Sequence, residues 1–188
     1  MPQRPAPHNH NPTLTTDRLI LRLPVPEDAE DMLVFRGDPV VQKYNSVPLA
    51  HAEEARDYIE KWLLECKAGE RKIWGITLKE EGTMIGMVGL GSWRKHDRRA
   101  EVGYDMARAY WGRGIGTEAV RAAVCFGFEH MNLNRIEAAT IADNMGSVRL
   151  LEKLGFTREG TLREYSLEQD GRFHDEANYG ILKREFLP

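Results

Sequence analysis

The stretch Trp111-Gly112-Arg113-Gly114-Ile115-Gly116-Thr117 is a glycine-rich turn, and the rest of the chain is interpreted around it. Residues 100–106 before the turn read as a strand, and residues 118–126 after it read as a helix. Glycine lets the backbone approach a ligand closely, and the first N–H groups of a helix have no intrahelical partner. A strand, this turn and a helix start together predict a site for anionic oxygen, such as a phosphate.

The composition is typical of one soluble globular domain. The chain has 188 residues, of which 41% are hydrophobic and 29% charged. Its net charge of -3 does not indicate binding to nucleic acid or to an anionic membrane. Cys66 and Cys125 lie far apart in the sequence and match no metal spacing, which favours a reducing cytoplasm over a disulfide framework. The sequence also lacks the ~18 consecutive apolar residues of a membrane span and the apolar core of a signal peptide.

The sequence predicts a disordered tail followed by one domain. Residues 1–12 are rich in Pro, His and Asn, and such a segment buries little apolar surface. Residues 13–188 carry the periodic apolar pattern. The expected strands are 14–23, 71–79, 83–91, 99–106, 135–141, 156–167 and 173–182, and the expected helices are 27–36, 52–68, 117–131 and 144–154.

The lengths of the connections predict how these strands pair. Short links between strands 71–79, 83–91 and 99–106 indicate antiparallel neighbours. The helix between strands 99–106 and 135–141 requires a crossover, so these two strands should be parallel. The fold class is therefore α+β, with a mixed, mostly antiparallel sheet and helices on its faces.

Four ordered stretches of the chain resemble the GNAT acetyltransferases, and within them the branch that acetylates the N-termini of ribosomal proteins. These stretches are Leu14 to Arg22, Glu101 to Tyr104 with Tyr110 to Ala119, Asn144 to Phe156, and Arg158 to Gly160 continuing through Gly171 and Asp175. The resemblance spans about residues 14 to 186. It implies the GNAT fold, in which the sheet splays between two parallel central strands.

The resemblance also implies acetyl-CoA as the co-substrate, without a metal. Its pantetheine arm would pair with the backbone of Tyr104 and Met106, and the N–H of Met106 would polarise the thioester carbonyl. The turn would hold the pyrophosphate, and Asn144 would contact the pantetheine side. The predicted cofactor-binding residues are Tyr104, Met106, Trp111, Gly112, Arg113, Gly114, Ile115, Gly116, Thr117 and Asn144. The alternatives are a plain N-cap for Asn144 and a solvated side chain for Arg113.

Glu101 and Ser147 are the candidate catalytic residues. Glu101 lies on the strand beside the expected thioester, where a carboxylate can take the proton of an amine. The alternative is an exposed strand residue paired with Arg98 or Arg99. Many GNAT enzymes have a tyrosine at the position of Leu151 that protonates the leaving thiolate, which leucine cannot do. Ser147 is the substitute candidate, directly or through water; its alternative role is to help cap the helix.

Three further segments are candidates for the acceptor side. They are Tyr44-Asn45, the loop from Trp93 to His96, and the pair His174-Asp175. The corresponding alternatives are plain surface for the two loops and a salt link within the hairpin for the pair.

The predicted activity is acetyl transfer to a primary amine by direct attack in a ternary complex. The favoured acceptor is the N-terminal amine of a ribosomal protein. The alternatives are a small amine, a polyamine and a non-catalytic acyl-CoA sensor. A polyamine needs a cluster of carboxylates, for which the acidic residues at 27–31 and 53–54 are the candidates, although they have the pattern of helix faces. Neither cysteine lies in the inferred site, so no covalent acyl-enzyme is expected. The oligomeric state is left open between monomer and homodimer.

Overall fold

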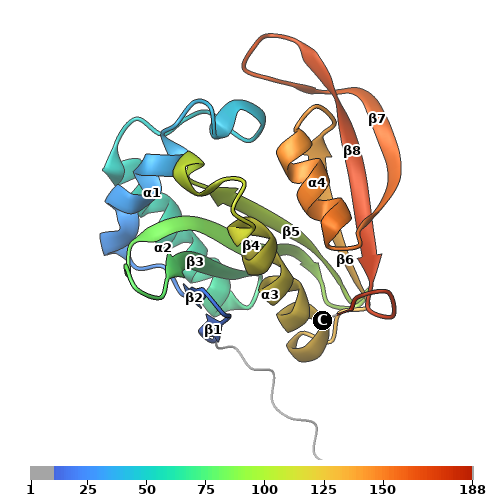
Figure 1. The fold of residues 1–188 in the computed structure, drawn as a ribbon, viewed down its shortest axis with the longest axis horizontal. Coiled ribbons are helices and arrows are strands. Elements are labelled where there is room, and N and C mark those ends of the chain that lie inside the picture. The colour runs from blue at the N-terminus through green and yellow to red at the C-terminus, as the bar shows by residue number, and fades with distance from the viewer. Residues whose placement is uncertain (1–10, 188) are drawn as a thin grey trace, which may run out of the picture.

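A sheet of eight strands in the order β1-β2-β3-β4-β5-β6-β8-β7 runs through the computed structural model, which describes residues 11–187 (Figure 1). The strands are β1 (Leu14–Thr15), β2 (Leu19–Arg22), β3 (Lys72–Leu78), β4 (Met84–Arg94), β5 (Arg99–Met106), β6 (Arg135–Ile141), β7 (Thr157–Leu167) and β8 (Phe173–Leu182). The helices are α1 (Ala29–Arg36), α2 (Ala52–Ala68), α3 (Ile115–His130) and α4 (Met145–Lys153). Three 3-10 turns accompany them, η1 (Pro26–Asp28), η2 (Gln42–Tyr44) and η3 (Arg108–Tyr110).

The sheet opens between β5 and β6, its parallel pair of neighbours. Pairing covers Arg99 to Glu101 on β5 against Arg135 to Glu137 on β6, and the two strands then diverge. The other neighbouring strands pair antiparallel. The expected α+β class, the parallel pair and the splay are thereby confirmed.

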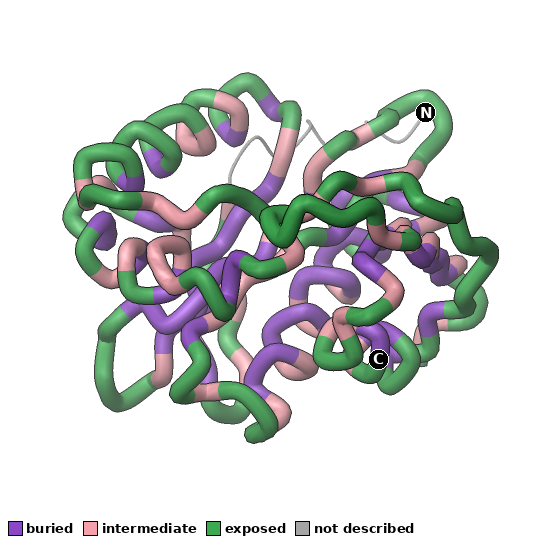
Figure 2. Tube along the Cα trace, turned by 90° about the horizontal axis from the view of Figure 1, so that it is seen from above, coloured by how far each residue is buried: buried purple, intermediate pink, exposed green. Residues whose placement is uncertain are grey.

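Helices cover both faces of the sheet. Helices α1 and α2 bury Met32, Phe35 and Ile59 against one face, where Met87 of β4 lies. Helices α3 and α4 pack on the other face, against residues such as Trp74 of β3. Buried residues accordingly follow the inner strands and the inner sides of the helices, and exposed residues follow the outer surface (Figure 2).

Two of the expected boundaries that differ from the structure have identifiable causes, one distant in the sequence and one local. The expected strand 14–23 is instead the hairpin β1–β2, whose turn is fixed where Thr16 and Arg18 hydrogen-bond with Glu118 of α3. Helix α3 begins at Ile115 rather than at residue 117, because Gly114 adopts a left-handed conformation (φ 74°) and serves as its N-cap.

The expected tail of residues 1–12 lies outside the described residues except for its last two. The side-chain amide of Asn11 donates to the carbonyl of Ile73 (2.6 Å). The indole N–H of Trp74 donates to the carbonyl of Pro12 (2.7 Å). For these two residues the expected disorder is corrected, since both are held against β3.

Within residues 11–187, no helix has the length and apolar character that crossing a membrane requires. The same residues contain no group of three or more His, Cys, Asp or Glu side chains placed to hold a metal ion.

Candidate active site

The free backbone edge of β5 faces the gap in the sheet. Ala107 donates its N–H to the carbonyl of Ile85 (2.9 Å), which continues the register of β5 with β4. Hydrogen-bonded pairs alternate along an antiparallel ladder, so Gly103 and Asp105 direct their backbone groups towards β4. Tyr104 and Met106 direct theirs towards β6, at positions where β6 has already diverged. These are the two residues whose backbone was expected to pair with an extended ligand.

The turn after β5 has the backbone geometry of an anion site. Gly112 and Gly114 have φ values of 73° and 74°, a region that favours glycine. The N–H groups of Ile115, Gly116 and Thr117 lie in the first turn of α3, where no intrahelical carbonyl is available to them. The turn therefore presents a row of free donors and the positive end of the helix dipole, which fits a phosphate.

Side chains of the turn have structural contacts of their own. The indole N–H of Trp111 donates to the carbonyl of Met106 (2.8 Å), which ties the turn to the end of β5. The guanidinium of Arg113 lies over the ring of Tyr110, 5.7 Å from its centroid. A Cβ on Gly116 would lie 2.8 Å from Cε of Met106, so glycine permits the close packing of α3 on β5. A phosphate contact by the Arg113 side chain stays a prediction.

Arg18 is a cation beside the turn that sequence reasoning did not assign. Its Nη1 donates to the carbonyl of Arg113 (2.9 Å), and its Nε donates to Glu118 (2.7 Å). Glu118 lies in the first turn of α3, where an unpaired carboxylate would repel a phosphate. Arg18 pairs with this carboxylate while its side chain stays 47% exposed. The sequence did contain a signal for Arg18, because this residue lies in the stretch Leu14 to Arg22 that resembles the family.

A pair of hydroxyl groups bridges β5 and α4. The Tyr104 hydroxyl and Oγ of Ser147 lie 2.7 Å apart. Burial raises the pKa of Tyr104 to about 12, although the hydrogen bond with Ser147 acts in the opposite direction, so the phenol is protonated at neutral pH. Oδ1 of Asn144 accepts from the N–H of Ser147 (3.3 Å), which makes Asn144 the N-cap of α4. Leu151, one turn further along α4, is completely buried.

Glu101 lies on the opposite side of β5 from this pair of hydroxyl groups. Side chains alternate along a strand, so Tyr104 faces α4 while Glu101, Gly103 and Asp105 face α1 and α2. Glu101 is exposed and accepts from Oγ of Ser92 (3.3 Å).

The alternative for Glu101, an ion pair with Arg98 or Arg99, is contradicted. Arg98 hydrogen-bonds Asn132 instead. Arg99 pairs with Glu137 at 2.6 Å. The carboxylate of Glu101 is therefore not held by either neighbouring cation.

A cavity of about 310 Å³ lies beside Glu101, between β3–β5 and the helices α1 and α2. Glu101 and Asp105 border it from β5, Arg36 from α1 and Trp62 from α2. Strand β5 thus has a cavity with a carboxylate on one face, the Tyr104–Ser147 hydroxyl pair on the other, and unpaired backbone at its edge towards the gap. This arrangement could hold an amine on one side of β5 and a thioester on the other.

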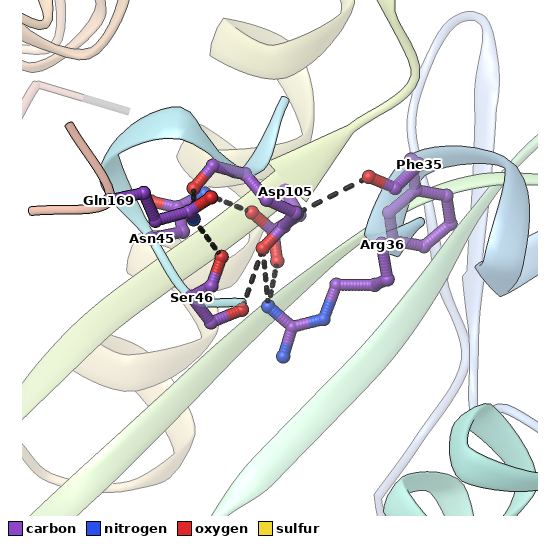
Figure 3. Close-up of polar contacts among 7 residues, drawn as sticks. Phe35, Arg36, Asn45, Ser46, Asp105 and Gln169 are labelled. Carbon is purple, nitrogen blue, oxygen red and sulfur yellow. Dashed lines mark hydrogen bonds and ion pairs between the residues drawn. The ribbon is translucent and has the colours of Figure 1, made fainter. Parts of the chain in front are cut away.

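Asp105 connects the cavity to helix α1 and to the segment 42–46 (Figure 3). Its carboxylate pairs with Nη1 of Arg36 (2.8 Å) and accepts from the amide of Asn45. Burial raises the pKa of Asp105, and the charge of Arg36 together with these hydrogen bonds acts in the opposite direction. Gln169, at the tip of the β7–β8 hairpin, donates to the carbonyls of Gln42 and Ser46. The hairpin tip and the segment 42–46 therefore contact one another, and Asn45 of that segment holds the Asp105 carboxylate.

The candidate acceptor segments have different positions. Asn45 is part of the Asp105 network, and the ring of Tyr44 meets His174 edge-on with centroids 6.1 Å apart. Nε2 of His174 lies 2.9 Å from Asp170 within the hairpin, a contact that is a salt link only when the imidazole is protonated. Trp93 is partly buried against the core of the α3 and α4 face, and Ser92 is the neighbour that lines the cavity.

Neither cysteine is placed for nucleophilic catalysis. Both thiols are free; Cys66 is buried on α2 and Cys125 is half-buried on α3. Burial raises the pKa of each thiol, which disfavours the reactive thiolate.

Comparison with known proteins agrees with this geometry. Residues 18–157 match the family model described as an acetyltransferase (GNAT) domain. The chain is 39% identical over 175 residues to the uncharacterized N-acetyltransferase p20 of Bacillus licheniformis, covering 93% of this chain and 98% of that one. It is 31% identical over 177 residues to YdaF of Bacillus subtilis, named as a candidate ribosomal N-acetyltransferase, covering 90% and 94%.

A solved structure shares the same architecture. RimL, described as a ribosomal alpha-N-protein acetyltransferase in complex with coenzyme A, superposes with a TM-score of 0.83 over 91% of this chain and 98% of that one. The two sequences are 20% identical, so this likeness concerns the fold alone.

Proposed function

The chain belongs to the GNAT family of acetyl-CoA-dependent N-acetyltransferases, and we propose that its acceptor is the N-terminal amine of a protein, with ribosomal proteins as the first acceptor class. The main support for the proposed catalytic mechanism is the position of β5. This strand has a carboxylate on one face, a hydroxyl pair on the other and unpaired backbone at its edge. The name of the relative YdaF supports the acceptor class. The proposed unit is one domain, residues 13–188, acting in the cytoplasm as a monomer or homodimer.

The described residues fit acetyl-CoA along the gap and the turn. Tyr104 would pair with the pantetheine arm through its backbone, Met106, whose carbonyl accepts from Trp111, would contribute its N–H, and Asn144 would contact the arm from α4. The amides of residues 112–117 would bind the pyrophosphate, with Arg18 as an added cation. When bound, acetyl-CoA supplies the activated acetyl group.

Acetyl transfer to the amine then needs three contributions from the protein: removal of a proton, stabilisation of negative charge and protonation of the leaving sulfur. Glu101 takes a proton from the acceptor ammonium, directly or through water, and frees the amine lone pair for attack on the thioester carbon. The N–H of Met106 donates to the carbonyl oxygen as negative charge develops on it. The nitrogen gives up its second proton to water as collapse breaks the carbon–sulfur bond, and the Tyr104–Ser147 pair donates a proton to the departing sulfur. Holding both substrates against one strand contributes through proximity and orientation.

The hydroxyl pair gives the first prediction. Ser147→Ala and Tyr104→Phe should each lower kcat about 10²-fold, near the lower end of general acid–base catalysis. The double variant should be no slower than the slower single variant, because the two hydroxyl groups act as one proton path. Thiol release measured at saturating acetyl-CoA checks this. Unchanged kcat values, or effects that multiply in the double variant, would contradict a shared role.

The acceptor class is tested with the purified protein and in cells. Mixed with acetyl-CoA, the protein should release free thiol with N-terminal peptides of ribosomal proteins faster than with polyamines. Mass spectrometry of a deletion strain should show acetylated ribosomal N-termini that have become unmodified. Intact N-terminal acetylation in that strain would overturn the proposed acceptor. Tight acetyl-CoA binding without turnover of any amine would favour a sensor.

A small amine is the second candidate, because a cavity of about 310 Å³ lies within the usual range for small-molecule sites. A polyamine is less well supported, since three of the acidic residues it would need have other partners. Asp28 pairs with Arg22, Asp31 accepts from the N–H of Met84, and Glu54 accepts from the N–H of Ala50.

A further inference from the structure

The floor of the cavity beside Glu101 is bare backbone. Gly89 and Gly91 of β4 lie opposite Gly103 and Glu101 of β5 in the register, and all four residues line the cavity. A Cβ built on Gly103 would meet no atom within 4 Å. Glycine within a strand weakens it and often marks a place where a ligand approaches the backbone. The missing side chains create a space over the sheet centre, on the face where Glu101 stands.

Two guanidinium groups and an indole form the wall of this space. Arg36 and Arg71 line the cavity, and their Cζ atoms lie 5.7 and 5.8 Å from the ring centroid of Trp62. The Nε of Arg36 is buried and, within residues 11–187, has no hydrogen-bond partner. Buried donors without a partner are rare in native proteins. A carboxylate oxygen bound beside Arg36 would give this donor a partner.

Arg71 brings positive charge close to Glu101 without pairing with it. Its Nη2 lies 3.2 Å from the position of a Cβ on Gly91, and Gly91 is the cross-strand partner of Glu101. The ion pair that the structure shows for Arg71 is with Glu65, through Nε at 3.1 Å. A carboxylate and a guanidinium thus border one part of the glycine floor, an arrangement that matches a ligand carrying both an amine and an anion.

We propose that the acceptor carries a carboxylate a few bonds from its reactive amine, and that Arg71 and Arg36 bind this carboxylate beside Trp62 while Glu101 faces the amine. The proposal rests on the acetyltransferase function and specifies its substrate. Two kinds of acceptor have an amine and a carboxylate at this spacing: a free amino acid, and a protein whose first side chain is acidic. A charge-assisted contact to arginine also explains why the cavity wall holds cations next to the residue that must receive a proton.

Matched acceptors test this substrate class. Rates of thiol release are compared for amino acids and their carboxamides, and for peptides beginning with Glu or Gln. Each acid should exceed its amide by at least about tenfold in kcat/KM, as expected for hydrogen bonds to a charged group. The better of the two acid series identifies the source. Equal rates for acids and amides would overturn the proposal while leaving the acetyltransferase function in place.

Direct binding keeps the proposal testable if turnover is slow. With coenzyme A present, titration calorimetry should show the acid binding at least about tenfold more tightly than its amide. Arg71→Gln should remove this preference and Arg71→Lys should restore part of it, with the KM for acetyl-CoA unchanged. Equal binding of acid and amide, or no binding of either, would overturn the proposal whatever the activity.

Gly103→Ala tests whether the cavity is the acceptor site. The added methyl group enters the open space above the floor, so the KM for the acceptor should rise at least about tenfold. Gly160→Ala on β7 is the matched control, because its Cβ also meets nothing within 4 Å. Both variants should unfold at similar temperatures. An unchanged acceptor KM in Gly103→Ala would overturn the assignment of the cavity.

Discussion

Replacing Glu101 by Gln is expected to lower kcat/KM for the acceptor about 10²–10⁴-fold at neutral pH, the usual contribution of a general base. Glutamine keeps the size of the side chain and loses the ability to take a proton. The variant then depends on acceptor molecules that are already deprotonated. Its rate should rise about tenfold per pH unit until the pKa of the acceptor amine is reached, which shifts the pH optimum upwards.

The control for Glu101 is Ser92→Ala. This substitution removes the hydroxyl group that donates to the Glu101 carboxylate but leaves the carboxylate itself. It should therefore retain most of the activity and the wild-type pH profile. If Glu101→Gln has the same pH–rate profile as the wild type, Glu101 is not the base.

Met106→Pro is expected to lower kcat about 10²–10³-fold, the cost of losing one oxyanion donor. Proline has no N–H, and the N–H of Met106 points into the gap rather than towards β4, so no ladder hydrogen bond should be lost. Proline also restricts the residue before it to extended conformations, which Asp105 already has within β5.

Two substitutions at the same position separate the backbone from the side chain. Met106→Leu conserves the volume and the N–H, so its kcat should remain close to that of the wild type. Met106→Ala removes the contact with α3 at Gly116 but keeps the N–H. The oxyanion role would be contradicted if Met106→Ala lost as much kcat as Met106→Pro, or if the proline variant lost none.

The elements whose bounds agree with the prediction are those whose ends are marked by residues within or next to them in the sequence. Helix α2 ends where expected because Gly69 takes the left-handed conformation (φ 70°) that closes a helix. Strands β5 and β6 also have the expected bounds. The β1–β2 hairpin was missed because its turn is fixed by Glu118, about a hundred residues later in the chain. Local alternation contains no information about such a contact.

In the candidate site too, contacts between residues far apart in the sequence could not be predicted. The motif around the turn indicated which residues line the gap, and strand alternation then places Glu101 and Tyr104 on opposite faces of β5. The ion pair between Arg36 and Asp105 joins α1 to β5 and had no local signal. The glycine floor did have one, since Gly89, Gly91 and Gly103 interrupt strands at positions where apolar side chains are usual.

Hydrogen exchange of the β5 amides tests the central claim, that acetyl-CoA binds along the free edge of β5 and the turn that follows. Exchange is measured by NMR with and without acetyl-CoA. If acetyl-CoA binds there, the amides of Tyr104 and Met106 and those of residues 112–117 become protected. Gly103 and Asp105, whose amides point to β4, should change little. Saturation with acetyl-CoA that leaves Tyr104 and Met106 exchanging at their original rates would contradict the account.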